Sequence, residues 1–257
     1  MSTPTGRVPV VPFLLGFLAL YAVLAGLAEL DPTGRYGIGI LAAVLLAAIA
    51  VVRWLDRTGP LCALRGLGLG RPDGRAVLVA VGLAVVIQGV YPLVGVITGA
   101  ALTLKPGWPW LVLGIFAFHG LAEELVWRGY AFGRLRRGRS FGAAVVATIP
   151  LVAATHLPVI VTSGLTVGVA AMLVAAITSL PLAHLFERGR NTIWAPAVVH
   201  TGIDTFKLVT IPDGARQVFS LTLAAISLAV PLLALAYRAR PRPNPTATPT
   251  RQPSANS

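Results

Sequence analysis

The chain carries about eight apolar segments, each long enough to cross a lipid bilayer. A helix that spans the hydrocarbon core needs roughly 17 to 25 apolar residues. Hydrophobic residues make up 56% of the sequence and charged residues only 12%, about half of the charged fraction of a typical soluble domain. The pattern predicts an all-α fold, a polytopic transmembrane bundle of about eight helices. The expected spans are 9–30, 36–52, 76–104, 108–131, 140–162, 164–186, 192–211 and 217–237.

Two parts of different composition divide the chain. The apolar segments place an integral membrane domain over residues 1–238. Residues 239–257 are rich in Pro, Thr, Ser and Asn, and such a segment cannot bury enough apolar surface to fold. We therefore predict a disordered, Pro-rich tail after the last span.

The net charge of +12 follows the expected topology. The predicted cytoplasmic loops hold 16 of the 21 Lys and Arg residues, and the outer segments keep only Arg35, Lys105, Lys207 and Arg216. This bias matches the positive-inside rule and places both termini in the cytoplasm. It predicts a multi-pass protein of the plasma membrane, with lipid and not nucleic acid as the partner of its surface.

Two adjacent acids and an arginine lie in the apolar stretch from Gly107 to Phe132. Each charge at the centre of a membrane helix costs roughly 2.5 to 3.5 kcal/mol, so Glu123, Glu124 and Arg128 need partners or a wet cavity. Glu124 and Arg128 are four residues apart, on one helical face where they can form an ion pair.

His119 lies four residues before Glu123, on a second face of the same helix. The two side chains can therefore form a hydrogen bond. We interpret His119 chiefly as a residue that links neighbouring helices.

Two further spans carry titratable residues at a similar depth. His156 lies between Pro150 and Pro158, which interrupt its helix. His200 and Asp204 are four residues apart and are expected to form a pair. Counted at about 1.5 Å per residue, these groups and Glu123 lie at similar heights, which predicts one polar cavity shared by three helices.

Three motifs, in this order, resemble those of the CPBP family of intramembrane proteases. They are E-E-x-x-x-R at Glu123, Glu124 and Arg128, the intramembrane His156, and H-x-x-x-D at His200 and Asp204. The family includes the type II CAAX prenyl endopeptidases and bacterial relatives linked to bacteriocin self-immunity. The resemblance covers about residues 108–206. It implies an intramembrane endopeptidase that hydrolyses a peptide bond of a membrane-associated protein or peptide, in a cavity reached from the cytoplasmic side.

The sequence departs from the family pattern at two positions. Val152 replaces an aromatic residue four positions before His156, and Asp204 replaces the more frequent Asn. An acid at position 204 can hold His200 as an imidazolium.

The same residues suit peptide hydrolysis on chemical grounds, because this reaction needs an activated water, a proton donor and a group that faces the oxyanion. Glu123 with His156 is expected to polarise the water. His200, oriented by Asp204, would stabilise the oxyanion. The resemblance implies the same broad roles, with Glu123 or Glu124 as the water-activating carboxylate. Arg128 then supports Glu124 or binds substrate.

Other chemistries remain open from the sequence. Glu123, His156 and His200 would also make a zinc site with an open position, although no H-E-x-x-H helix is present. We expect a mechanism without a cofactor, with zinc as the alternative. A proton-coupled transporter or a non-catalytic membrane scaffold would also keep acids and histidines at mid-membrane.

Overall fold

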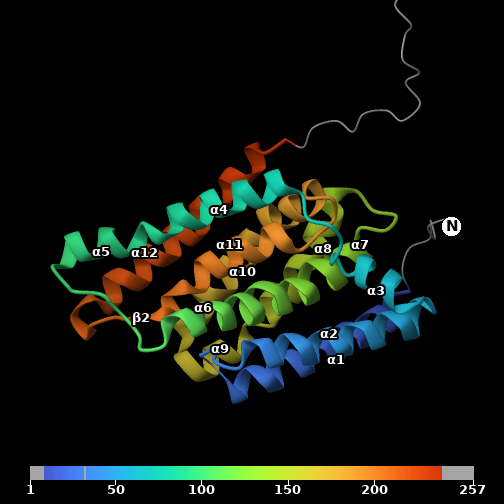
Figure 1. Ribbon diagram of the computed structural model, residues 1–257, viewed down its shortest axis with the longest axis horizontal. Coiled ribbons are helices and arrows are strands. Elements are labelled where there is room, and N and C mark those ends of the chain that lie inside the picture. Colours follow the sequence, from blue (N-terminus) through green and yellow to red (C-terminus); the bar gives the residue numbers. More distant parts are fainter. Residues whose placement is uncertain (1–8, 32, 239–257) are drawn as a thin grey trace, which may run out of the picture.

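The structure is a computed structural model that describes residues 9–31 and 33–238. Long helices lie side by side along one direction (Figure 1). The tail predicted for residues 239–257 lies outside the described residues. The elements are α1 (Val10–Leu30), α2 (Gly37–Asp56), α3 (Pro60–Gly66), α4 (Gly74–Gln88), α5 (Val90–Thr98), β1 (Thr103–Leu104), α6 (Trp108–Ile115), η1 (Phe116–Ala122), η2 (Leu125–Phe132), α7 (Gly133–Leu135), α8 (Phe141–Ala154), α9 (Leu157–Ser163), α10 (Leu165–Arg188), α11 (Trp194–Asp204), η3 (Thr205–Leu208), β2 (Val209–Thr210), η4 (Asp213–Ala215), α12 (Arg216–Ala229) and η5 (Val230–Ala236).

Seven helical segments in the described part of the chain are long and apolar enough to cross a membrane. Large apolar side chains such as Leu18, Val85 and Val161 are exposed on the outside of the bundle, where lipid is the natural solvent. The all-α, multi-pass architecture expected from the sequence is confirmed. The spans are Val10–Leu30, Gly37–Asp56, Gly74–Thr98, Trp108–Leu135, Phe141–Ser163, Leu165–Arg188 and Asp213–Ala236.

The segment predicted as a span over 192–211 differs from the expectation. Its helix, α11, has 11 residues, a length of about 16 Å that is too short to cross the hydrocarbon core. The chain then forms the 3₁₀ turn η3 and the strand β2, which pairs antiparallel with β1. The β-branched run Val209–Thr210 followed by Pro212 favours extended backbone over helix.

The short helix α11 lies inside the bundle, against α4, α10 and η1 (Figure 1). Two glycines allow this close packing. A Cβ on Gly120 would overlap Thr201 Oγ1 and the carbonyl of Ala197, and a Cβ on Gly202 would overlap Ala84. Small residues of this kind let membrane helices approach closely, and here Gly120 brings α11 against the fourth span and Gly202 brings it against α4.

Candidate functional site

The fourth span changes its helix type on both sides of its adjacent acids. The π-helical segments η1 and η2 precede and follow Glu123 and Glu124. A π-helix bonds residue i to residue i+5 and occurs often at functional sites. Its wider turn places residues four or five apart on one face of the helix. This geometry aligns His119 with Glu123, and Glu124 with Arg128.

The side chain of Glu124 is fully buried and accepts two hydrogen bonds on one oxygen. Arg128 Nη1 donates to Glu124 Oε1 at 2.6 Å, which confirms the expected ion pair. His200 Nδ1 lies 2.8 Å from the same oxygen. Because an ionised carboxylate only accepts, Nδ1 of His200 carries the proton. Glu124 therefore fixes the position of the His200 imidazole through its Nδ1 atom.

Glu123 lies between two imidazoles. Its Oε1 is 2.7 Å from His119 Nδ1, which confirms the hydrogen bond expected from their spacing. Its Oε2 is 3.5 Å from His200 Nε2. The side chain of Glu123 keeps 15% of its surface exposed, whereas that of Glu124 keeps none. Glu123 is thus the more accessible acid of the two.

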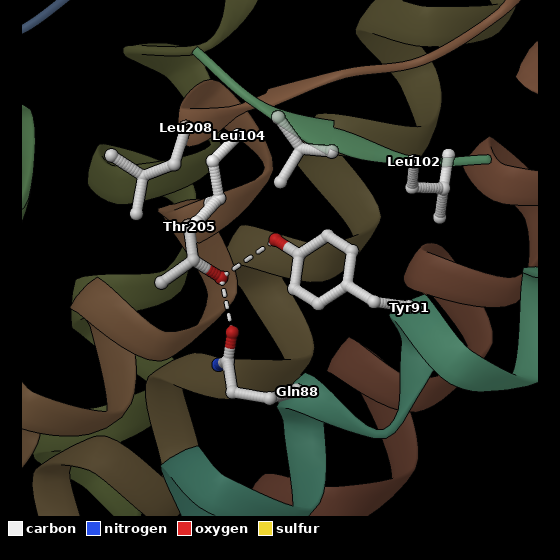
Figure 2. Close-up of a pocket in the computed structure, with 7 residues that line it drawn as sticks. Gln88, Tyr91, Leu102, Leu104, Thr205 and Leu208 are labelled. Atoms are coloured by element: carbon white, nitrogen blue, oxygen red, sulfur yellow. Dashed lines mark hydrogen bonds between the residues drawn. The ribbon is translucent and has the colours of Figure 1, made fainter. Parts of the chain in front are cut away.

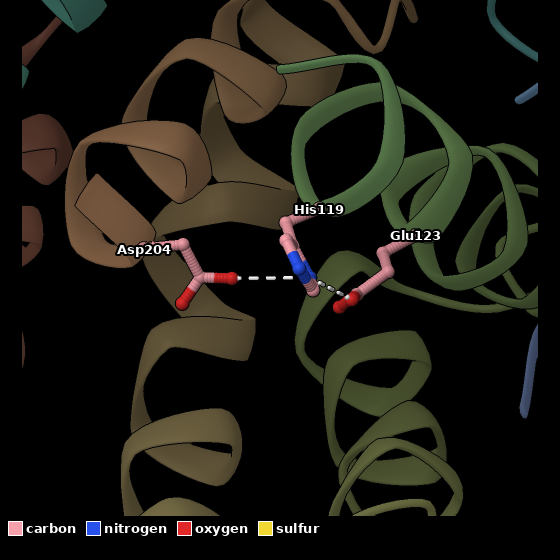
Figure 3. A group of neighbouring side chains, drawn as sticks. All are labelled: His119, Glu123 and Asp204. Atoms are coloured by element: carbon pink, nitrogen blue, oxygen red, sulfur yellow. Dashed lines mark hydrogen bonds and ion pairs between the residues drawn. The ribbon is translucent and has the colours of Figure 1, made fainter. Parts of the chain in front are cut away.

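Asp204 contacts a different imidazole from the one expected. Its Oδ2 lies 3.2 Å from His119 Nδ1, and Lys207 Nζ donates to the same oxygen at 3.1 Å. The expected pair of His200 with Asp204 is therefore replaced, since His200 is bound by Glu124. The acid at position 204 has a local partner in Lys207, three residues further on. Figure 3 shows His119 between Asp204 and Glu123.

Lys207 also contacts His119. Its Nζ lies 2.8 Å from His119 Nε2. An ammonium group only donates, so Nε2 accepts, and the proton of the neutral imidazole lies on Nδ1, which faces the two acids. We call these residues the acid–imidazole cluster: His119, Glu123, Glu124, Arg128, His200, Asp204 and Lys207.

His156 lies at the junction of α8 and α9. Its Nδ1 is 2.9 Å from the carbonyl oxygen of Val152 and 3.3 Å from Thr155 Oγ1. Over the described residues, His156 makes no hydrogen bond to the acid–imidazole cluster. The structure thus brings together five of the six site residues expected from the motifs, and His156 stands apart from their contacts.

A possible metal site differs from the expected zinc set. In the described part of the chain, the three residues whose ligand atoms lie within 4.8 Å of one another are His119, Glu123 and Asp204. The set of Glu123, His156 and His200 is not such a group. The Lys207 ammonium already contacts His119 and Asp204, and a positive charge at this distance opposes a metal ion. These residues do not fit a metal while Lys207 is charged.

A cavity of about 320 Å³ lies between residues of α4, α5, β1 and the segment that follows α11 (Figure 2). Its walls are mainly apolar, and Tyr91 OH donates to Thr205 Oγ1 at 2.9 Å, which lies 2.8 Å from Gln88 Oε1. Thr205 directly follows Asp204, so the cavity and the cluster share the C-terminal end of α11. An apolar pocket with a few polar groups is typical of ligand sites. The lining residues are Gln88, Tyr91, Leu102, Leu104, Thr205, Leu208 and Val209.

Sequence reasoning underestimated two residues of the cluster. His119 does link two helices, as interpreted, but its partners are the acids of the site. Lys207 was counted only as a charge of an outer segment. The spacing of Asp204 and Lys207, three apart and close to the last motif, is the signal that could have identified it.

Comparison with known proteins gives one match. Residues 105–206 match the family model described as type II CAAX prenyl endopeptidase Rce1-like. The matched segment is less than half of the chain, and it contains the whole acid–imidazole cluster except its last residue, Lys207. No curated protein matched the chain, and no solved structure matched it.

Proposed function

Since residues 105–206 form a domain of the type II CAAX prenyl endopeptidase family, we propose that this multi-pass membrane protein is an intramembrane endopeptidase of the glutamate type. In this proposal, Glu123 activates a water that hydrolyses a peptide bond of a membrane-associated peptide or protein. The observation that carries it is the approach of Glu123 Oε2 and His200 Nε2 to 3.5 Å.

One water molecule can contact both atoms from the side, at about 2.8 Å from each. Glu123 would take a proton from that water as it attacks the scissile carbonyl, and would then give the proton to the leaving amine. This is the role that the motif E-E-x-x-x-R implies for one of its two acids. The contacts favour Glu123 over Glu124, because Glu124 is fully buried and is engaged by Arg128 and His200.

His200 is the proposed donor to the developing oxyanion. The cluster contains three carboxylates and two permanent cations, Arg128 and Lys207. One further positive charge is needed for neutrality, and His200, within reach of both acids of the fourth span, is placed to supply it as an imidazolium. Its Nε2–H would then face the oxyanion.

The proposal keeps His156 as a second imidazole of the site, although it makes no hydrogen bond to the cluster among the described residues. Its Nδ1 is used by the carbonyl of Val152, which leaves Nε2 for substrate or solvent. The proposal includes no metal, because the ammonium of Lys207 lies among the ligand atoms that a metal would need.

The proposed location is the plasma membrane, with the arginine-rich end of the bundle in the cytoplasm. This end carries Arg134, Arg136 and Arg137 at the end of the fourth span, and Arg188 and Arg190 at the end of α10. Such a bias of Lys and Arg is what the positive-inside rule requires.

The test is cleavage by purified protein in proteoliposomes. A prenylated, internally quenched peptide with a free C-terminal carboxylate is the first substrate, and mass spectrometry identifies the fragments. Glu123→Gln is expected to lower the rate at least about 100-fold, because it removes the general base. The matched control is His184→Gln, because the imidazole of His184 contacts the carbonyl of Tyr237 and no residue of the cluster. This variant should cleave at the wild-type rate.

A second assay does not depend on the chosen peptide. Membrane proteomes of cells with wild-type protein and with Glu123→Gln are compared for fragments that need the carboxylate. Absence of such fragments, together with Glu123-dependent proton or solute flux in vesicles, would contradict the protease and support a transporter.

A further inference from the structure

The group of His119, Glu123 and Asp204 has the shape of a three-ligand cation site. His119 Nδ1 lies 2.7 Å from Glu123 Oε1 and 3.2 Å from Asp204 Oδ2, and the ligand atoms of all three lie within 4.8 Å of one another. These side chains come from two elements, η1 with the residue that follows it, and α11. The nitrogen and oxygen ligands of one metal ion approach each other in this way.

A cation of the chain itself reaches this group. Lys207 Nζ is 2.8 Å from His119 Nε2 and 3.1 Å from Asp204 Oδ2. The other permanent cation of the cluster, Arg128, contacts Glu124 and not these residues. Lys207 therefore neutralises the part of the cluster that Arg128 does not reach.

Backbone contacts fix the position of Lys207. It lies in η3, directly after α11, and the next residues enter the strand β2. Leu208 accepts a hydrogen bond from the backbone N–H of Lys105 at 2.8 Å, and Val209 pairs with Leu104. The side chain of Lys207 is only 20% exposed. The helix before Lys207 and the backbone contacts after it therefore hold its ammonium group at the cluster.

We propose that Lys207 is a tethered cation that takes the place of a metal ion at this cluster and, through His119, positions Glu123. The hydrogen bonds run in one direction: Lys207 Nζ donates to His119 Nε2, and His119 Nδ1 donates to Glu123 Oε1. This leaves Glu123 Oε2 directed at His200. The positioning role rests on the proposed protease function, whereas the cation role does not.

The cation role is tested by zinc binding, which needs no activity. Wild-type protein, Lys207→Met and Lys207→Arg are purified without a histidine tag and titrated with Zn²⁺ against a chromophoric chelator. Lys207→Met is expected to bind one Zn²⁺ at least about tenfold more tightly than wild type, because a positive charge has left the site. Lys207→Arg should bind as weakly as wild type.

Matched variants locate the ion. Adding Asp204→Asn to Lys207→Met should abolish the gained affinity, and adding His184→Gln should preserve it. Wild-type protein that binds Zn²⁺ as tightly as Lys207→Met would overturn the proposal, and so would a gain that survives Asp204→Asn. Thermal unfolding of each variant identifies those that fold, and Lys207→Gln, which also removes the positive charge, takes the place of Lys207→Met if that variant does not fold.

The positioning role is tested by the split between kcat and KM. His119→Gln and Lys207→Met should each lower kcat by about 10- to 100-fold, the effect expected of a misplaced catalytic group, with KM little changed. Lys207→Arg, which retains the charge, should recover most of the lost kcat. Unchanged kcat in His119→Gln and Lys207→Met would overturn this role. A wild-type protein that cleaves nothing would instead contradict the proposed function and leave the zinc titration as the test of the cation.

Discussion

The fourth span carries two arginine–carboxylate pairs in different settings. Arg128 and Glu124 belong to one helix, and one guanidinium nitrogen meets one oxygen that His200 also uses. Arg134, six residues further on, meets Asp56 of α2 through two parallel bonds of 3.0 and 2.7 Å. The first pair leaves Glu124 Oε2 buried without a partner among the described residues, whereas the second satisfies both oxygens.

The difference separates two uses of the same chemistry. A bidentate ion pair between two helices, such as that of Arg134 with Asp56, fixes how the helices pack, because its two bonds define one orientation. A pair within one helix fixes no neighbour, and here the paired oxygen of Glu124 also binds a third group, His200. The pair at Arg134 is therefore expected to affect stability, and the pair at Arg128 both stability and activity.

The largest effect is expected from Arg128→Met. This change leaves Glu124 buried without its cation, and breaking a buried pair costs about 3–5 kcal/mol. Unfolding in mixed micelles with increasing SDS measures this loss. The double variant Glu124→Gln/Arg128→Met should regain most of the stability but little of the cleavage, because His200 loses the charged acceptor that orients it. A double variant with wild-type activity would show that the pair is only structural.

A smaller effect is expected from Arg134→Gln. The guanidinium is buried, but Asp56 keeps 22% of its side-chain surface exposed, so water can replace part of the lost contact. Hydrogen bonds to charged groups contribute about 1.5–3 kcal/mol, and the loss of stability should lie in this range. Cleavage at the temperature where the variant is folded should equal that of wild type. If Arg134→Gln lost activity while it remained folded, the pair of Arg134 with Asp56 would not be purely structural.

The smallest effect concerns Asp73, which caps α4 at the same end of the bundle as Arg134. The backbone N–H of Ala76 holds the pKa of the Asp73 carboxyl below its usual value, and the N–H of Arg75 adds to this effect. A lowered folded-state pKa means that the stabilisation is present above the unfolded value of about 3.9 and is lost as the pH falls below it.

Asp73→Ala should therefore cost about 1 kcal/mol near neutral pH, as is typical of a lost N-cap. Thermal unfolding of both proteins from about pH 6 to pH 3 measures the difference, which should shrink towards the acid end as the wild-type carboxyl is protonated. A constant difference over this range would assign the effect to packing instead of charge.

The membrane architecture was predictable because the hydrophobicity of about 20 consecutive residues is summed over each span. Seven of the eight expected spans correspond to helices that can cross a membrane. The exception, 192–211, has the apolar content of a span but contains His200, Asp204 and Lys207, which form contacts that a regular helix does not offer. Composition alone does not reveal where a helix ends within the bundle.

The candidate site was predictable only along each helix. The spacing of Glu124 with Arg128, and of His119 with Glu123, gave both contacts correctly, since residues four apart share a face. Contacts between helices depend on rotation and depth, which spacing does not give. For this reason His200 was paired with Asp204 on its own helix instead of Glu124 on another, and His119 was not assigned to the site.

The two π-helical segments have a consequence for how this chain tolerates length changes. Each residue added to or removed from a helix turns everything beyond it by about 100°. Deleting one residue within Phe116–Ala122, with the bonding of the remaining residues unchanged, would turn Glu123 by about 100° away from His200. A deletion scan through this span should therefore be far more damaging than a substitution scan, and alignments of its relatives should place few gaps here.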